Sequence, residues 1–537
     1  MTEFANLDWV IVGLYFAVLF AVALWVILQK QNNTEDYFLA GRNMGWFIVG
    51  ASIFASNIGS EHVVGLAGSG ASDNFPLLIY ELHAWVVLML GWLFLPFYHR
   101  AGVFTTPEFL EKRFSPSARW FLSIFSLIAY VLTKVSVTVY AGGIVISTLL
   151  NIEFWTGALA TVILTGIYTV LGGMRAVVYT EALQTIVLIL GAIFLTVFGL
   201  DAVGGWEELQ NTVGPEYMDM WRSNDDKDYP WFYLAFSSSV VGIWYWCTDQ
   251  YIVQRVLTAK NVQEGRRGAI WGGFLKLLPV FIFLIPGVIA LALKMQGQLE
   301  WDSPDQAFPA LLSKVLPAGL RGLVAAGLLA ALMSSLASVF NSCSTLFTVD
   351  IYQKLNPNKS EKELLQIGRI ATVIIVLAGI GWIPIMQNIS SVLYEYLQSV
   401  QSYIAPPITA IFLLGIFSKR INSRGAMAAL ASGLVIAIFR ITLELTKGNF
   451  ADDSIFFMLG NTNFLIFSTW FFVAMVGITV GVSLLTPPDD EDKIAGLTLD
   501  TVSEEQKALN RESFNMWDVA ASLFVVAIVV FVMFYFS

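Results

Sequence analysis

A run of polar and charged residues interrupts an apolar stretch near the start of the chain, in the segment ASIFASNIGSEHVVGLAGSG at positions 51–70. The run begins at Ser56 and Asn57 and ends at His62, after which apolar residues resume. Irregular backbone inside a bilayer survives only where it is buried in protein or lines a cavity, so we expect a helix that breaks here. The carbonyl groups at such a break can hold a cation, and the helix ends can face a polar substrate. The segment is therefore predicted to form half of an ion and substrate site.

A face of small residues on a later apolar segment is the candidate for the other half of the ion site. Ala331, Ser334, Ser335 and Ser338 are spaced i, i+3, i+4 and i+7, so they share one face of a helix. Their hydroxyl oxygens suit a hard cation such as sodium, although the same spacing is typical of a packing seam between membrane helices. On its own the motif favours packing. The carbonyl groups of residues 55–58 would add the oxygen atoms that one helix lacks, and with them a sodium site is predicted.

Two charged residues, Glu81 and Lys276, lie inside predicted membrane spans. An isolated charge is costly inside a membrane, so such residues are candidates for a functional site. If the two form an ion pair, the site has no net charge, which favours a neutral substrate that forms hydrogen bonds. Lys134 is also predicted inside a span, and its role stays open.

Several further residues offer this substrate hydrogen bonds or flat apolar surfaces, and they are Asn57, His62, Tyr245, Trp246 and Gln398. A pyranose matches such a set, because it has hydroxyl groups around its rim and C–H groups on its faces. The alternative for the two aromatic residues is a belt at the membrane interface. That alternative explains less well a run, WYWCTDQ, in which polar residues follow directly.

The composition places the chain in a membrane. Of its 537 residues 56% are hydrophobic and only 13% are charged, which excludes a soluble multidomain protein. The apolar runs last about 18 residues or more, the length of a membrane-spanning helix, whereas barrel strands alternate over about ten residues. The net charge of −10 gives no reason to expect a nucleic-acid partner. The two cysteines, Cys247 and Cys343, lie in separate predicted spans and indicate neither a disulfide framework nor a metal cluster.

The apolar runs predict an all-α protein with about fourteen transmembrane helices, at residues 8–28, 45–70, 76–98, 118–149, 154–172, 176–200, 231–254, 267–293, 318–350, 363–385, 390–417, 423–445, 462–485 and 514–535. Basic residues gather in every second connection between them. Since cytoplasmic loops carry the excess of lysine and arginine, these connections are predicted to be cytoplasmic and both termini to lie outside.

Polar breaks recur at corresponding points of two five-helix blocks, which is typical of an inverted repeat with a binding site at the interface of its halves. The predicted organisation is an N-terminal helix and cytoplasmic loop (1–44), a first repeat (45–202), an extracellular loop (203–230), a second repeat (231–418) and three C-terminal helices (419–537).

Seven stretches resemble motifs of the sodium/solute symporter family, and within it of the sodium/glucose cotransporter branch. They are NTEDYFLAGR at 33–42, ASNIGSEHVVGLAGSGA at 55–71, GVFTTPEFLEKR at 102–113, YTVLGGMRAVVYTEALQT at 168–185, WYWCTDQYIVQRVLTAKN at 244–261, SSLASVFNSCSTLFTVDIY at 334–352 and SYIAPPITAIFLLGIFSKR at 402–420. The resemblance implies a leucine-transporter-like core of two inverted five-helix repeats, with one helix before it and three after it.

The resemblance also implies the residues of the site. Sodium would be held by the backbone carbonyls of Ala55, Ile58 and Ala331 and the hydroxyls of Ser334 and Ser335. The sugar would contact Asn57, His62, Glu81, Tyr245, Trp246, Lys276 and Gln398, with Tyr245 closing an inner gate. Two positions depart from the family pattern, because Glu181 stands where relatives often have aspartate and Ala337 where they have a hydroxyl residue. Both bear on a second sodium site in some relatives, so one sodium per sugar is expected here.

The sequence therefore predicts a secondary active transporter of the cell (inner) membrane, surrounded by lipid, that couples sodium to a neutral sugar such as glucose or galactose by alternating access. The alternatives are a sodium symporter for myo-inositol, an amino acid or an organic anion, or a transporter-like membrane sensor. An enzyme is not expected, because His62, His83 and His99 stand in separate settings and supply neither a catalytic base nor a metal cluster. The sequence identifies neither the sugar nor the oligomeric state.

Overall fold

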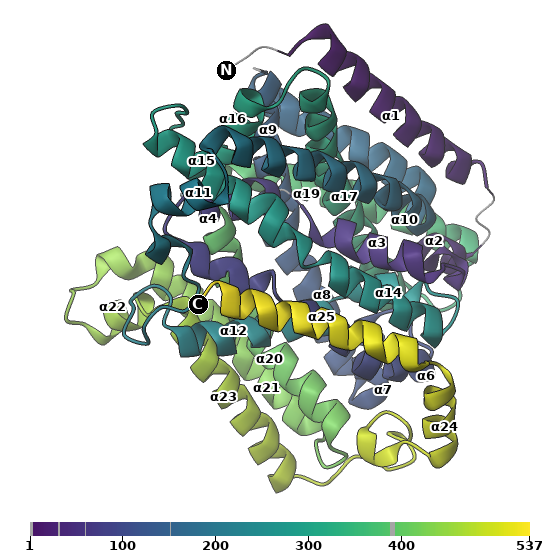
Figure 1. Cartoon of the computed structure of the whole chain (residues 1–537). Coiled ribbons are helices and arrows are strands. Elements are labelled where there is room, and N and C mark those ends of the chain that lie inside the picture. The colour runs from purple at the N-terminus through teal and green to yellow at the C-terminus, as the bar shows by residue number, and fades with distance from the viewer. Residues whose placement is uncertain (1–3, 30–32, 60, 151, 387–392) are drawn as a thin grey trace.

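The computed structural model describes residues 4–29, 33–59, 61–150, 152–386 and 393–537. Within these ranges the chain is a bundle of helices without a β-strand (Figure 1). Eleven of the described helices are long and apolar enough to cross a membrane, or twelve if one bent pair counts as a span. The prediction of an all-helical, multi-pass membrane protein is confirmed. The number fourteen stays a prediction, and positions 390–392 of one predicted helix lie outside the described residues.

The first half of the chain contains α1 (Asn6–Ile27), α2 (Thr34–Leu39), α3 (Trp46–Asn57), α4 (Ala67–Gly70), α5 (Ala84–Met89), α6 (Leu95–Ala101), α7 (Thr106–Arg113), α8 (Pro116–Tyr130), α9 (Ser136–Leu150), α10 (Phe154–Val203) and α11 (Trp206–Val213). Short 3₁₀ or π segments join several of them, namely η2 (Glu61–Leu66), η3 (Phe75–Tyr80), η4 (Leu90–Phe94) and η5 (Val131–Val135).

The second half contains α12 (Trp231–Ile243), α13 (Gln250–Leu257), α14 (Val262–Leu275), α15 (Ile285–Met295), α16 (Ala307–Val315), α17 (Leu320–Thr345), α18 (Gln353–Leu355), α19 (Glu361–Met386), α20 (Leu393–Phe417), α21 (Ser423–Thr446), α22 (Ile455–Gly460), α23 (Phe464–Leu485), α24 (Glu504–Glu512) and α25 (Met516–Tyr535). The joining segments near the site are η7 (Trp244–Thr248), η8 (Val280–Leu284) and η10 (Leu346–Tyr352).

The helix that the polar run was predicted to interrupt is broken. Helix α3 ends at Asn57, and the backbone of Ile58 is extended, with φ −78° and ψ 99°. The chain resumes helical structure at Glu61, in a direction bent by 60° from α3. The carbonyl groups at the end of α3 are thereby released from regular helix hydrogen bonding.

A second interruption divides α10, where two separate helices at 154–172 and 176–200 were predicted. Gly173 has φ 56° and ψ −157°, which breaks the helical geometry within the element. A side chain there would also meet the carbonyl oxygen of Tyr37 at 2.7 Å. Glycine is required at this turn both for its backbone angles and for the close approach.

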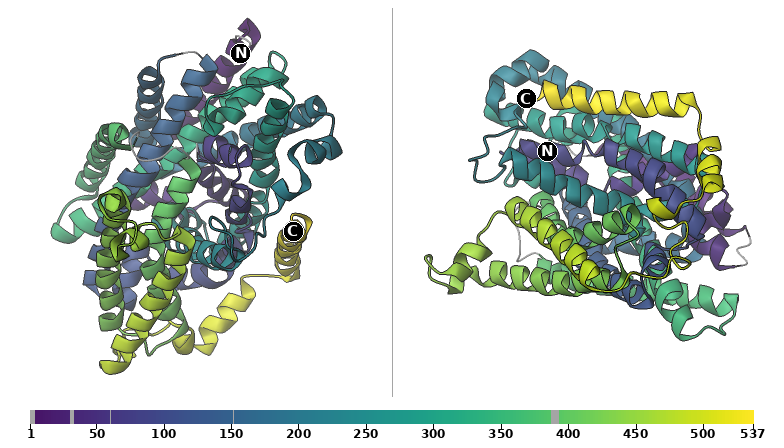
Figure 2. Two further views of the ribbon diagram at one scale, coloured as in Figure 1. Left: turned by 90° about the vertical axis from the view of Figure 1, so that its left-hand side faces the viewer. Right: turned by 90° about the horizontal axis from the view of Figure 1, so that it is seen from below.

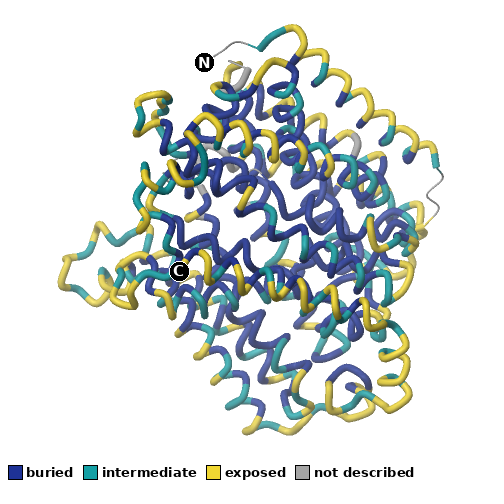
Figure 3. The backbone as a smooth tube through the Cα atoms, in the orientation of Figure 1, coloured by how far each residue is buried: buried dark blue, intermediate teal, exposed yellow. Residues whose placement is uncertain are grey.

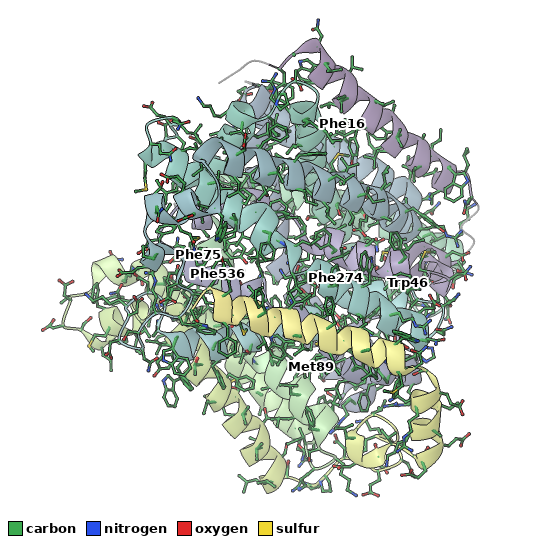
Figure 4. The ribbon with its side chains drawn as sticks, viewed as in Figure 1. Phe16, Trp46, Phe75, Met89, Phe274 and Phe536 are labelled. Atoms are coloured by element: carbon green, nitrogen blue, oxygen red, sulfur yellow. The ribbon has the colours of Figure 1, made fainter. Side chains whose placement is uncertain are left out.

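Helix α17 forms the centre of the bundle. It contacts α1, α3, α10 and α19, and nearly all of its residues are buried. By contrast, α1 and α25 lie on the outside of the bundle (Figures 1 to 3). Both helices expose apolar side chains. The C-terminal end of the chain packs against its first half. The ring centroids of Phe75 and Phe536 lie 5.3 Å apart (Figure 4). Apolar faces on the outer helices are what a lipid environment stabilises.

A buried ion pair anchors α1 on α17. Asp8 accepts hydrogen bonds from the backbone N–H groups of Gly319 (2.7 Å) and Gly322 (2.8 Å), and the guanidinium of Arg321 lies 2.6 Å from it. Removal of one partner of a buried pair costs about 3–5 kcal/mol. We therefore expect Asp8→Ala to lower the melting temperature of the detergent-purified protein clearly, whereas Asp201→Ala, at an exposed position, leaves it unchanged. Equal melting temperatures for the two variants would contradict this anchoring role.

Candidate ion and substrate site

The predicted ion site lies where the end of α3 meets the middle of α17. The hydroxyl of Ser334 donates a hydrogen bond to the carbonyl oxygen of Ala55 (2.9 Å), and that of Ser335 donates to Ile58 (3.3 Å). Ala331 lies one turn earlier on α17 and is buried. Each serine hydroxyl keeps lone pairs that a cation can use, as do the carbonyl oxygens. The group therefore offers a hard cation several oxygen ligands and no formal charge.

The predicted ion pair between Glu81 and Lys276 is present. Lys276 Nζ lies 2.5 Å from Glu81 Oε2 and 3.0 Å from the side-chain oxygen of Asn57. On the other side, His62 Nε2 lies 3.3 Å from Glu81 Oε1. Glu81 is fully buried, with no exposed surface. The ends of two helical elements position the two charged side chains. Glu81 directly follows η3, and Lys276 directly follows α14.

All seven residues predicted to contact the substrate line a single cavity, and they are Asn57, His62, Glu81, Tyr245, Trp246, Lys276 and Gln398. The cavity volume is about 40 Å³. That is room for only a few water molecules, and a sugar ring is larger. A ring-sized substrate therefore needs these side chains to separate.

The two aromatic residues of the predicted site are held by the π-helical turn η7 and are buried in protein, not placed in an interfacial belt. Asn57 donates a hydrogen bond to the hydroxyl of Tyr245 (3.3 Å). The ammonium of Lys276 lies 5.4 Å from the ring centroid of Trp246, within the range of a cation–π interaction. Asn57 thus contacts both Lys276 and Tyr245, which joins the ion pair to the aromatic wall.

Other residues of the cavity had no predicted role. Tyr394 donates a hydrogen bond to Glu81 Oε1 (2.8 Å), and Glu61, His83 and Lys134 also line the cavity. The sequence held a signal for Tyr394, because it precedes Gln398 by four residues and so shares its helix face. No such spacing marks Glu61, since it follows the break directly.

A separate buried cluster surrounds Glu181, one of the two departures from the family pattern. Its carboxylate accepts hydrogen bonds from the hydroxyls of Ser52, Ser56 and Ser338. The guanidinium of Arg255 lies 3.5 Å from the same carboxylate. Since Arg255 neutralises this carboxylate within the protein, the cluster gives no support to a second sodium ion.

Comparison with known proteins identifies the family. The model of the sodium:solute symporter family matches residues 37–433. The chain is 39% identical over 522 residues to sodium/glucose cotransporter 1 of Sus scrofa, covering 89% of this chain and 78% of that protein. It is 41% identical over 472 residues to sodium/myo-inositol cotransporter 2 of Homo sapiens, covering 81% and 70%.

The fold also has counterparts among solved structures. A sodium-coupled sialic acid symporter in its substrate-bound, outward-open state superposes with a TM-score of 0.75 at 22% identity, covering 91% of this chain and all of that one. A transporter of the nucleobase-cation-symport-1 family gives a TM-score of 0.53 at 14% identity, covering 89% of this chain and all of that one. These similarities support the predicted transporter fold. The chain therefore belongs to the sodium:solute symporter family, and it is a multi-pass membrane symporter that couples a solute to sodium and is not an enzyme.

Proposed function

We propose that the chain carries a neutral sugar of the glucose or galactose type together with sodium. The observation that carries this proposal is the buried pair of Glu81 and Lys276 within a cavity of hydrogen-bonding side chains. A charge-balanced polar site suits a substrate with many hydroxyl groups and no charge. An organic anion would bring a net charge that this site does not balance, and a zwitterionic amino acid would bring two charged groups where the charges of the site are already paired. The sodium/glucose cotransporters among the relatives support the same substrate class.

The proposed cycle uses the contact between α3 and α17. Sodium bound by Ala55, Ile58, Ala331, Ser334 and Ser335 ties the broken helix to α17 and orders the neighbouring substrate site. The sugar then binds, Tyr245 serves as the inner gate, and the two inverted repeats (45–202 and 231–418) rock between outward-open and inward-open forms. A potential of about 100 mV supplies roughly 2.3 kcal/mol per charge. A tenfold sodium gradient adds about 1.4 kcal/mol, so one ion sustains about a 500-fold sugar gradient.

We also infer fourteen spans, with both termini outside a cell (inner) membrane. Besides the eleven long apolar helices and the bent pair counted as a twelfth span, the described residues include a shorter apolar helix at Phe154–Ile167. A further candidate is the pair of α12 and α13, which η7 joins. Counted as spans, these bring the total to fourteen. The pattern of basic residues in the connections supports the orientation.

Myo-inositol is the second candidate substrate. A relative at 41% identity is a sodium/myo-inositol cotransporter, and inositol shares the neutral ring of hydroxyl groups. Uptake of labelled glucose, galactose and inositol into proteoliposomes, in sodium and in potassium, separates the candidates. The proposal predicts sodium-dependent uptake of one of the two sugars, and uptake that is equal in potassium would contradict it.

Gln398 gives a sharper test of the sugar site. Its side-chain oxygen is buried without a hydrogen-bond partner among the described residues, and it lines the cavity. If it serves the sugar, Gln398→Ala loses a hydrogen bond worth about 1–2 kcal/mol. We expect the KM for sugar to rise about tenfold, with the sodium dependence nearly unchanged.

The matched control is Gln210→Ala on the extracellular helix α11, which should leave uptake unchanged. Measured KM values that are the same for both variants would exclude Gln398 from the site.

A further inference from the structure

Glu61 is a buried carboxylate that the transport scheme above does not use. It begins η2, the helical segment that follows the break, and only 5% of its surface is exposed. Its Oε2 atom is buried and has no hydrogen-bond partner among the described residues. A buried carboxylate without partners is costly, so a cation at or near this position would stabilise it.

The backbone at Gly59 places this carboxylate beside the ion site. A Cβ atom built on Gly59 would collide with Glu61 Oε2 and would lie 2.5 Å from the hydroxyl of Ser335. Both oxygens therefore border the same small space, directly after the carbonyl of Ile58. Because a side chain at Gly59 would fill this space, glycine keeps it open between the two oxygens.

The same carboxylate faces a lysine on the side of the substrate cavity. Glu61 and Lys134 both line the cavity, and a carboxylate and an ammonium that share a buried cavity attract one another. The ammonium of Lys134 lies 4.1 Å from the ring centroid of Tyr245 and 4.6 Å from that of Tyr251. Lys134 is 5% exposed, and no carboxylate among the described residues lies within ion-pair distance of it.

We propose that Glu61 is a charged ligand of the sodium site and that Lys134 competes with sodium for it. This inference deepens the proposed function and rests on its sodium site, whose remaining ligands carry no formal charge. Sodium draws the carboxylate towards Ser335 and Ile58, and this releases Lys134. Lys134 contacts the ring of Tyr245, and Tyr245 contacts Asn57, so occupancy of the ion site reaches the substrate site through these two contacts.

Substitutions of Glu61 and Lys134 are predicted to have opposite effects on sodium affinity. The affinity is measured as equilibrium binding of radioactive sodium to the purified protein without sugar. Glu61→Gln should raise the half-saturating sodium concentration at least about tenfold, because it removes the only charged ligand. Lys134→Met should lower that concentration several-fold, because it removes the competitor. In the double variant that combines Glu61→Gln with Lys134→Met, the lysine substitution should no longer increase the sodium affinity.

Glu61→Asp, which keeps the charge, should bind sodium better than Glu61→Gln, and this separates a charge effect from a folding defect. Glu207→Gln, at an exposed position on α11, should match the unmodified protein. An unchanged sodium affinity in Glu61→Gln would overturn the inference, as would weaker sodium binding in Lys134→Met. The proposed function fails separately, if the unmodified protein binds sugar equally well without sodium.

Discussion

Lys276→Ala should reduce sodium-driven sugar uptake by at least about 100-fold. The substitution leaves Glu81 buried without its cation, and breaking such a pair costs about 3–5 kcal/mol. It also removes the donor that lies 3.0 Å from Asn57, so both the charge balance and the hydrogen-bond pattern of the site are lost. The measurement is the initial rate of labelled sugar uptake into proteoliposomes under a sodium gradient.

Two further measurements show whether this loss belongs to the substrate site. Sodium binding to Lys276→Ala should persist, because Lys276 is not among the proposed ion ligands. Lys314→Ala, at an exposed position on α16, should transport normally. A sugar uptake rate for Lys276→Ala within threefold of the unmodified protein would show that the ion pair only stabilises the fold.

Ser335→Ala is expected to weaken sodium binding by about 10-fold to 100-fold. The variant removes an oxygen ligand and leaves the carbonyl of Ile58, 3.3 Å from that hydroxyl, without a partner. A hydrogen bond to a charged group contributes about 1.5–3 kcal/mol, and we take the loss of one ion ligand to be similar. The measurement is the sodium concentration at half-maximal sugar uptake, together with direct sodium binding.

The control for Ser335 lies on the same helix. Ser344 donates its hydroxyl to the carbonyl of Gly368 on α19, away from the ion site. Ser344→Ala should therefore alter stability at most, and its sodium dependence should equal that of the unmodified protein. If Ser334→Ala and Ser335→Ala both keep the normal sodium dependence, the serine face of α17 is a packing seam.

The free-energy cost of burying polar and charged groups explains which parts of the site were predictable from the sequence. Polar residues inside an apolar run have a high free-energy cost of burial unless they line a break in the helix. The chain bends directly after Asn57, at the position predicted from this cost. The same reasoning paired Glu81 with Lys276, because each buried charge needs the other. The resemblance to the sodium/solute symporter family implies the same positions.

Other parts depended on information that the local sequence does not contain. The interval 76–98 reads as one continuous apolar helix, yet it contains a 3₁₀ turn, two α-helical pieces and a π-helical turn. Such irregular turns arise where neighbouring helices and charged side chains compete for the backbone, and hydropathy does not record them. Contacts between segments far apart in the sequence could not be predicted either. Asp8 with Arg321 and Glu181 with Arg255 became visible only once the helices were packed.

The position of Glu61 illustrates this limit. In the sequence it is one polar residue among several, and its partners are set by the direction of the chain after the break. Only the packed structure places its carboxylate near both Ser335 and the substrate cavity.

Sugar binding to the purified protein, titrated in sodium and again in potassium at equal ionic strength, tests the central claim most directly. If the ion between α3 and α17 orders the substrate site, sugar should bind in sodium and bind at least about tenfold more weakly in potassium. Equal sugar affinity in the two salts would contradict the account.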